Sequence, residues 1–318
     1  MTRTTLITGG FGYLGGRIAQ ALATNPGLSL RLGTRRPHPA PPEWLRTCEP
    51  VPMDLMADED LAAACAGVSC VVHLAALNEN DSASDPEQAL LVNALGALKL
   101  LRAAEHAGVE RFIYFSTAHV YGAPLTGTIT EKTVPRPAHP YATTHRAAED
   151  FVLAAHDRRV LTGIVVRLSN GFGAPAHPEV NRWTLLANDL CRQAVATGAL
   201  QLRSSGLQQR DFITLSDVGR AVDHLIALPA DICGDGLFNL GGESPLRIID
   251  LTEQIAVRCN TVLGFIPPIL RPEPLPQEES LPLDFRIDKL TRTGFSLEGD
   301  FAGEIDATLR LCQQAFGK

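Results

Sequence analysis

Several features that define other protein classes are missing from this chain of 318 residues. No apolar run approaches the roughly twenty residues of a membrane span, so we expect no membrane contact. No basic run is longer than Arg35-Arg36, and the net charge of −7 disfavours a nucleic-acid partner. The seven cysteines form no Cys-x-x-Cys pair and no cluster with histidine, which predicts buried thiols and no metal site. The chain starts without a charged-then-apolar signal segment, so we expect a cytoplasmic protein.

A glycine-rich turn stands near the start of the chain. The apolar stretch Thr5–Thr8 leads into Gly9-Gly10-Phe11-Gly12-Tyr13-Leu14-Gly15, and a helical pattern follows. Gly9 permits a tight turn, Gly12 lets the main chain approach phosphates, and Gly15 lets the helix pack close to the strand. Backbone N–H groups and the positive end of the helix dipole then face an anion, which predicts a dinucleotide pyrophosphate site.

The first half of the chain alternates buried strands with helices. This alternation predicts an α/β fold, a Rossmann doubly wound parallel sheet that binds ligands at the carboxyl ends of its strands. Apolar runs bounded by turn residues predict strands at Leu28–Leu32, Val68–Leu74, Phe112–Ser116 and Gly163–Leu168. Helices are predicted at Glu59–Ala66, Pro86–Ala107 and Tyr141–Ala155, and further along at Trp183–Ala196 and Ser216–Leu228.

The alternation ends after Asn170, which predicts two parts. Residues 1–170 are expected to form the dinucleotide-binding domain, with residues 211–242 returning to it. Residues 171–210 and 243–318 are expected to form a smaller C-terminal lobe that binds substrate. Gln201–Phe212 looks strand-like, and the six prolines from Pro267 to Pro282 predict a loop.

Tyr141 and Thr117 are candidates for proton chemistry. Tyr141 opens a predicted helix, and His145 lies four residues later on the same helical face. Thr117 follows a predicted strand. A tyrosine at a helix start and a hydroxyl at a strand end can meet at the carboxyl edge of the sheet. There Tyr141 can exchange a proton with a substrate oxygen while Thr117 holds that oxygen.

The order of the motifs resembles that of the extended short-chain dehydrogenases/reductases, in the nucleotide-sugar (NAD-dependent) epimerase/dehydratase family. The matching segments are Thr8–Gly15, Asp54-Leu55, His73–Ala76, Asn93, Ser116–Gly122, Arg167–Gly173 and Arg210–Ile213. The resemblance implies catalytic roles for Thr117, Tyr141 and His145, and substrate binding by Thr117, Asn170 and Arg210. It implies cofactor binding by Gly9, Phe11, Gly12, Tyr13, Leu14, Gly15, Asp54, Leu55, Leu74, Ala75, Ala76, Asn93, Tyr141 and His145.

His145 departs from the family pattern, which has a lysine four residues after the tyrosine. A lysine cation about 6 Å from the tyrosine would lower its pKa by roughly two units. A histidine with a reference pKa near 6.5 is mostly neutral at pH 7, so it activates Tyr141 less. The substitution keeps open a second function, that of a cofactor-binding protein with little turnover.

Ala118 and His119 stand where sugar dehydratases of the family carry Asp-Glu as acid and base. Because alanine cannot transfer a proton, we expect 4,6-dehydratase chemistry to be disfavoured, leaving epimerisation or ketone reduction.

The end of the second predicted strand lacks the acidic residue that binds the ribose 2′-hydroxyl in NAD-preferring members. It carries Arg35 and Arg36, whose guanidinium groups can pair with a 2′-phosphate. This favours NADP over NAD as the cofactor.

These observations predict an NAD(P)-dependent oxidoreductase or epimerase that acts on a nucleotide-linked sugar. Tyr141 is expected to exchange the proton, and Arg210 to hold the diphosphate. A reductase of a small carbonyl compound without a nucleotide stays open as an alternative. The resemblance also implies a homodimer formed by the helices Pro86–Ala107 and Tyr141–Ala155, the second of which offers apolar Phe151, Val152 and Leu153.

Overall fold

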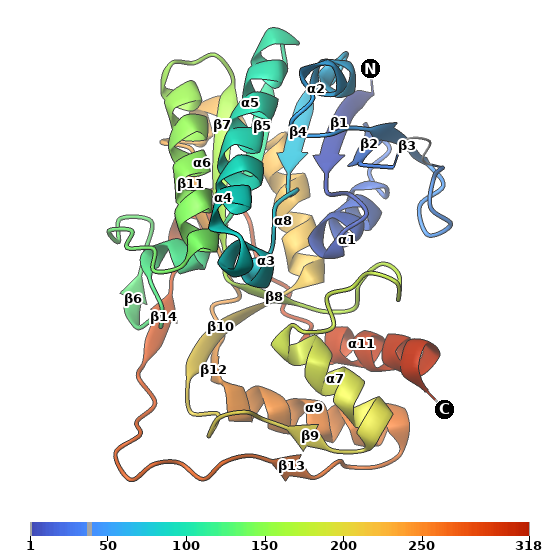
Figure 1. The fold of residues 1–318 in the computed structure, drawn as a ribbon, viewed down its shortest axis with the longest axis vertical. Coiled ribbons are helices and arrows are strands. Elements are labelled where there is room, and N and C mark those ends of the chain that lie inside the picture. The colour runs from blue at the N-terminus through green and yellow to red at the C-terminus, as the bar shows by residue number, and fades with distance from the viewer. Residues whose placement is uncertain (1, 37–39, 318) are drawn as a thin grey trace.

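A parallel sheet forms the centre of the chain in a computed structural model, which describes residues 2–36 and 40–317. Its strands are β1 (Arg3–Thr8), β2 (Leu28–Thr34), β3 (Cys48–Pro52), β4 (Cys70–His73), β5 (Arg111–Thr117), β7 (Thr162–Leu168) and β11 (Leu237–Leu240). They lie in the order β11-β7-β5-β4-β1-β2-β3, and every neighbouring pair is parallel (Figure 1). The predicted Rossmann doubly wound sheet is confirmed.

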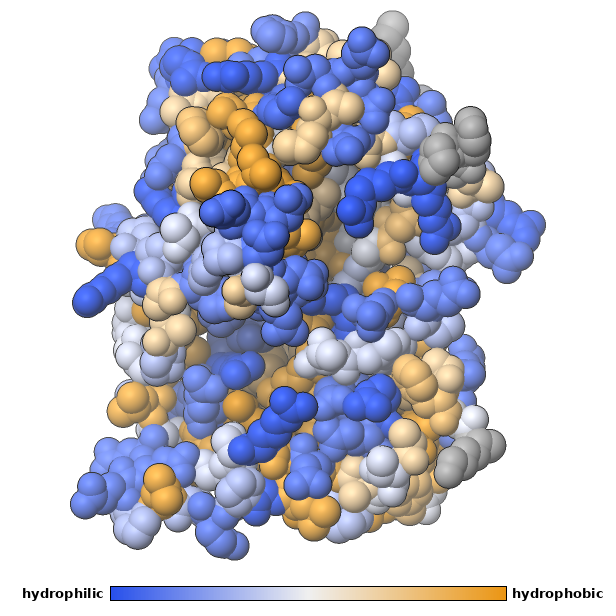
Figure 2. Space-filling view, viewed as in Figure 1, coloured by the Kyte–Doolittle hydropathy of each residue, from blue (hydrophilic) through white to orange (hydrophobic). Residues whose placement is uncertain are grey.

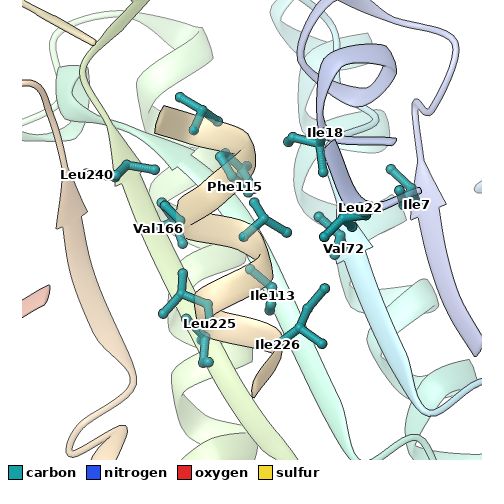
Figure 3. Packing of buried hydrophobic residues seen from close by; sticks show 14 of the residues in the cluster. Ile7, Ile18, Leu22, Val72, Ile113, Phe115, Val166, Leu225, Ile226 and Leu240 are labelled. Atoms are coloured by element: carbon teal, nitrogen blue, oxygen red, sulfur yellow. The ribbon is translucent and has the colours of Figure 1, made fainter. Parts of the chain in front are cut away.

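Helices cover both faces of this sheet. One face carries α1 (Tyr13–Leu22), α8 (Leu215–Ala227) and the short α10 (Asp288–Thr291). The other face carries α2 (Asp58–Cys65), α5 (Gly96–His106) and α6 (Pro140–Asp157). Successive strand residues point to opposite faces, so Ile113 and Phe115 pack with α8 while Phe112 and Tyr114 pack with α5 and α6. Figure 3 shows the first of these cores, with Ile18 and Leu22 of α1 facing Ile7 and Val72.

The strand order reverses between β1 and β4. After β1 the chain adds β2 and β3 on one flank of that strand, and it then places β4 and the later strands on the other flank. In open α/β sheets, ligands bind at such a point, beyond the carboxyl ends of the strands. The loop after β1 and the segment after β4 therefore meet at one edge. Two short helices follow β4, namely α3 (Glu79–Ser84) and α4 (Pro86–Ala89).

The remaining elements gather beyond this edge of the sheet (Figure 1). The helices there are α7 (Leu186–Thr197), α9 (Ile248–Leu263) and α11 (Phe301–Phe316), which share a separate apolar core. One small sheet joins β8 (Asn170–Phe172), β10 (Gln209–Thr214) and β12 (Pro245–Arg247). Two-stranded pairs join β9 (Leu200–Gln201) to β13 (Ile269–Leu270) and β6 (Gly127–Ile129) to β14 (Leu283–Phe285). The division at residues 170, 211 and 242 stays a prediction.

Ion pairing ties the glycine-loop helix α1 to these outer elements. The Arg17 guanidinium donates to the Glu304 carboxylate of α11 at 2.7 Å and to the Ala174 carbonyl at 2.8 Å. Glu304 also accepts from the Ser216 backbone N–H at 3.0 Å, at the start of α8. The Glu304 side chain is 4% exposed, so water competes little for this contact.

Several predicted elements differ in detail. The helix predicted over Pro86–Ala107 begins as expected, with the Asp85 carboxylate accepting from the Gln88 N–H at 2.9 Å, but a π-helical stretch at Leu90–Leu95 separates α4 from α5. The helix predicted at Trp183 starts three residues later, at Leu186. The strand-like stretch Gln201–Phe212 is divided between β9 and β10 by a turn at Gly206, whose φ is +80°. Within the described ranges, every helix is too short or too polar to cross a bilayer.

Candidate functional site

A cavity of about 540 Å³ opens at the carboxyl edge of the large sheet, facing the outer elements. Figure 2 shows the molecule hollowed at this level. Residues predicted for the cofactor, for catalysis and for the substrate border it together. They are Gly9, Phe11, Gly12, Tyr13, Leu14, Gly15, Leu74, Ala75, Ala76, Thr117, Tyr141, His145, Asn170 and Arg210.

Three glycines around the turn from β1 to α1 leave little room for a Cβ atom. Gly9 adopts a φ of +66°, which L residues rarely adopt, and a Cβ there would lie 3.2 Å from the Ala75 nitrogen. A Cβ on Gly15 would lie 2.2 Å from the Gly9 carbonyl oxygen, and one on Gly12 would lie 3.0 Å from the same atom. Main chain and the N-terminus of α1 therefore face the cavity directly. This cradle fits the pyrophosphate of a dinucleotide.

Five of the predicted cofactor residues lie elsewhere or play a supporting part. Arg35 and Arg36 are exposed beyond β2, and the Arg36 guanidinium lies 6.0 Å from the centre of the Phe11 ring. Asp54 accepts from the Met56 N–H at 2.9 Å, and Asn93 accepts from the Leu77 N–H at 2.7 Å. Asn93 therefore shapes the segment after β4, although it does not border the cavity. Leu55 packs against Gly96 of α5.

Tyr141 and Thr117 reach the cavity from two different elements. Tyr141 lies in the first turn of α6, where Pro140 supplies a fixed φ and the ring of His139 caps the Tyr141 N–H at 3.2 Å. Thr117 ends β5, and its Oγ1 accepts from the His119 N–H at 3.1 Å, which leaves the Thr117 proton for another acceptor. Burial raises the pKa of Tyr141 well above its usual range, and the Glu79 carboxylate raises it further.

His145 packs against Tyr141, with ring centres 4.4 Å apart. Its Nδ1 is 2.7 Å from the Tyr114 hydroxyl, whereas its Nε2 is buried without a hydrogen-bond partner in the described parts of the chain. Burial lowers the pKa of His145 to about 4, although Glu149 and Glu79 oppose that shift. The imidazole is therefore neutral near pH 7, and it supplies no cation beside Tyr141.

A buried ion pair, which the sequence analysis did not identify, supports this edge of the sheet. Glu149 lies one turn after His145 on α6, and the Arg167 guanidinium of β7 donates to it at 2.6 Å and 3.0 Å. Ser116, next to Thr117, donates to the same carboxylate at 2.5 Å, and Arg146 at 2.9 Å. Glu149 is 0% and Arg167 1% exposed, so the two charges balance each other inside the core. Nη1 of Arg167 has no hydrogen-bond partner among the described residues, and the guanidinium carbon lies 4.7 Å from the centre of the Tyr121 ring.

The outer side of the cavity carries charged residues that sequence reasoning also missed. Glu79 of α3 and Arg182, from the segment before α7, pair at 3.3 Å, and both border the cavity. Neither belongs to a motif; the only signal available was that Glu79 follows closely after the end of β4. Their meeting depends on the fold, because 103 residues separate them along the chain.

Arg210 and Asn170 lie where the small sheet meets the cavity. The side-chain amide of Asn170 donates to the Asp211 carbonyl at 2.9 Å, so this group joins β8 to β10. Among the described residues, the Arg210 guanidinium donates hydrogen bonds only to Gln208 Oε1, at 3.1 Å and 3.2 Å. A second hollow of about 790 Å³ shares Leu186 and Arg210 with the first. Arg210 therefore borders both spaces.

A glycine cradle at the switch point of a parallel sheet, with a tyrosine and a threonine beside it, defines a dinucleotide-binding protein of the Rossmann type. A family model described as the NAD dependent epimerase/dehydratase family matches residues 5–241. The chain belongs to that family.

Relatives of known name carry two kinds of activity. A dTDP-glucose 4,6-dehydratase of Streptomyces niveus is 30% identical over 80% of this chain and 77% of its own length. The dTDP-D-glucose 4,6-dehydratase of Mus musculus is 31% identical over 52% of this chain, and that match spans 44% of the mouse protein. Among solved structures, the UDP-glucose 4-epimerase of Thermotoga maritima, with UDP-glucose, superposes with a TM-score of 0.82. It is 19% identical over 98% of this chain and 99% of its own, a level that shows the fold alone.

These relatives correct the expectation that dehydratase chemistry is disfavoured. The reaction is therefore not limited to epimerisation or ketone reduction. That expectation rested on Ala118 and His119, yet proteins named as 4,6-dehydratases are about 30% identical to this chain. The cavity also explains why it was wrong. His119, Glu79 and Glu179 all border the cavity, so groups able to carry protons are present although Ala118 is not one of them. Epimerase and dehydratase chemistry both fit.

Proposed function

We propose that this chain is an NAD(P)-dependent enzyme that acts on a nucleotide-linked sugar, as an epimerase or a dehydratase. The observation that carries the proposal is the single cavity that the glycine cradle, Tyr141, Thr117 and Arg210 border together. A nicotinamide dinucleotide bound here would supply the hydride-transfer chemistry. The glycine loop and α1 would hold its pyrophosphate. The remaining steps depend on this chain's own side chains.

In this proposal Tyr141 moves the proton and Thr117 holds the reacting oxygen. The Thr117 hydroxyl accepts from the His119 N–H, so its own proton is directed toward a substrate oxygen. Tyr141 is protonated near neutral pH, because burial raises its pKa, and can give that proton to a developing alkoxide. Taking a proton in the opposite direction requires the rare ionised form. No cation at His145 helps that form, which favours slow turnover.

Single-turnover absorbance of the reduced nicotinamide tests the proposal. The protein is mixed with NAD or NADP and with UDP- and dTDP-linked sugars, and the products are separated afterwards. A changed stereocentre identifies an epimerase, and loss of water identifies a dehydratase. Cofactor binding without any change in sugar or absorbance, from mildly acidic to mildly alkaline pH, would contradict the enzyme. It would favour a cofactor-binding protein with little turnover.

Arg35 and Arg36 support a preference for NADP within this proposal. Both side chains are exposed after β2, which ends without a carboxylate, and Arg36 lies near Phe11 at the rim of the cavity. We expect the combined variant Arg35→Ala and Arg36→Ala to weaken NADP binding about ten- to hundredfold, because it removes charge-assisted hydrogen bonds to the 2′-phosphate. NAD binding should change little. Titration calorimetry with both cofactors measures this, with exposed Arg292→Ala as the control. Equal losses for NAD and NADP would contradict the preference.

Arg210 is proposed to bind the diphosphate of the nucleotide sugar. Arg210 borders both hollows, and Arg203 lines the second one, where Arg192 is paired with Asp189 at 2.5 Å. Arg210 and Arg203 are therefore the arginines that this side offers to an anion. We expect Arg210→Ala to raise KM for the nucleotide sugar at least about tenfold, with a smaller effect on kcat. Steady-state kinetics measure this. Arg247→Ala, which removes an exposed arginine paired with Asp250 in the same part of the molecule, is the control. An unchanged KM for Arg210→Ala would count against a diphosphate contact.

The proposal extends to a cytoplasmic homodimer. Leu91, Leu95 and Phe151 are each at least 40% exposed on the π-helical stretch and α6, and Figure 2 shows hydrophobic surface over α5 and α6. Such a patch supports pairing with a second copy. All seven cysteines are buried as free thiols, which supports a reducing compartment.

A further inference from the structure

Tyr114 lies in the interior of the sheet directly behind the cavity wall. It comes from the middle of β5 and faces α6, where its hydroxyl lies 2.7 Å from Nδ1 of His145. The two rings are tilted by 33° with centres 5.8 Å apart. Tyr114 is 2% and His145 4% exposed, so water does not compete for this hydrogen bond. Tyr114 itself does not border the cavity, whereas His145 does.

Either the Tyr114 hydroxyl or Nδ1 of His145 can be the donor in this hydrogen bond. The choice depends on whether every buried proton of the pair then has an acceptor. Within the described part of the chain, the Tyr114 hydroxyl makes no hydrogen bond except the one with His145. If Nδ1 carried the proton and donated to the tyrosine oxygen, the tyrosine O–H would be left buried without an acceptor. An unsatisfied buried donor is unfavourable enough to shift such an equilibrium. The favoured arrangement has the Tyr114 O–H donating to Nδ1, which leaves the ring proton on Nε2.

Nε2 of His145 is then a buried donor on a residue that borders the cavity. It makes no hydrogen bond among the described residues, although the nearby Phe115 carbonyl favours the protonated ring and so raises the pKa of His145. Nε2 of His73 is also buried without a partner among the described residues, so the lack of a partner does not by itself indicate a ligand. His145 differs because it borders the cavity, where a bound ligand can supply the acceptor. Because burial lowers the pKa of His145 to about 4, the ring is neutral at working pH and its tautomer decides what it can bind.

We propose that Tyr114 is a positioning residue that fixes His145 in the tautomer with its proton on Nε2, so that Nε2 donates to an acceptor oxygen of the bound dinucleotide. The inference rests on the proposed function, because the dinucleotide belongs to it. Beyond the proposed function, the inference assigns a role to the imidazole of His145. The side chain supplies one oriented neutral donor, and the orientation comes from β5 through Tyr114.

His73 offers an internal comparison on the other side of Tyr114. Its ring lies 5.6 Å from the Tyr114 ring, and its Nδ1 is 2.6 Å from Thr8 Oγ1. Thr8 Oγ1 accepts from the Leu74 and Ala75 N–H groups, so its proton points to His73. His73 therefore takes the same tautomer through a different donor. Removing the Tyr114 hydroxyl should leave it unchanged.

Nitrogen-15 NMR of histidine-labelled protein tests the positioning role directly, because the two ring nitrogens give different signals when protonated and when not. His145→Gln identifies the signals of His145. In the wild type we expect a protonated Nε2 and an unprotonated Nδ1. In Tyr114→Phe we expect a mixture of tautomers at His145 and an unchanged His73. Tyr121→Phe, which removes another buried hydroxyl, bonded to Asn239 at 2.7 Å, should leave His145 as in the wild type.

Cofactor binding gives the second readout. We expect Tyr114→Phe to weaken binding of NAD or NADP about tenfold, the size expected for one misoriented hydrogen bond, and Tyr121→Phe to leave it unchanged. A wild-type His145 protonated on Nδ1 would overturn the proposal, as would a Tyr114→Phe protein with the wild-type tautomer and affinity. A wild type that binds neither cofactor would overturn the proposed function instead, and the tautomer signals would still decide what Tyr114 does.

Discussion

Replacing Tyr141 with phenylalanine should lower kcat about 10²- to 10⁴-fold, the range that general acid–base catalysis contributes. The variant keeps the ring that packs 4.4 Å from His145, and it removes only the hydroxyl at the cavity. Cofactor affinity and the unfolding midpoint should therefore stay near those of the wild type. Single-turnover absorbance with the best substrate of the sugar panel measures the loss.

The pH dependence gives this prediction a second check. Burial and the Glu79 carboxylate raise the pKa of Tyr141, so the ionised form is rare at neutral pH. Where Tyr141 accepts the proton, the wild-type rate should rise about tenfold per pH unit without levelling off near pH 8, because the ionised fraction grows tenfold per unit below the pKa. His145 adds no inflection in this range, since its pKa is lowered to about 4. A plateau below neutral pH, or a Tyr141→Phe variant with wild-type kcat, would contradict the role of Tyr141.

Replacing Arg167 with methionine should lower the free energy of unfolding by about 3–5 kcal/mol, the effect of breaking a buried ion pair. The change leaves the Glu149 carboxylate 0% exposed, with Ser116 and the half-exposed Arg146 as its remaining partners. Methionine keeps much of the side-chain volume, so the loss comes from the uncompensated charge and not from a cavity. Urea unfolding followed by circular dichroism measures the change.

Two comparisons sharpen that experiment. Arg247→Met breaks an exposed pair with Asp250, whose effect should be about 0–1 kcal/mol. The double variant Arg167→Met with Glu149→Met removes both buried charges, and we expect it to be more stable than Arg167→Met alone. A loss below about 1 kcal/mol for Arg167→Met would mean that Arg146 is enough to balance Glu149. If the double variant were less stable than Arg167→Met, the Glu149 side chain would stabilise the fold even without the Arg167 charge, for example through its hydrogen bond with Ser116.

What the sequence predicted well is local in the chain. The turn from Gly9 to Gly15 needs its glycines for reasons that arise within a few residues, because the Gly15 position faces the Gly9 carbonyl. The alternation of buried strands and helices likewise needs no knowledge of distant contacts. Both led to the confirmed fold, and the proton chemistry assigned to Tyr141 and Thr117 stays a prediction.

What the sequence could not give depends on residues that meet only in the folded chain. The sequence showed that His145 is not a lysine, but the loss of its charge through burial and its contact with Tyr114 depend on how α6 packs on β5. Glu149 and Arg167 lie 18 residues apart on a helix and a strand. Glu79 was missed for the same reason, and the two residues after Thr117 alone led to the wrong expectation that dehydratase chemistry is disfavoured.

The contacts of Arg17 affect the design of chimeric proteins in which the outer elements come from another member of the family. The helix that carries the glycine cradle is joined to α11 through Glu304 and to the start of α8 through Ser216. A chimera that took α11 from another protein would lose Glu304, and the guanidinium would be left beside the Ser216 hydroxyl and the Ala174 carbonyl without a counter-charge. Transplanting a new specificity onto this scaffold therefore requires that Glu304 travel with it, or that position 17 be redesigned at the same time.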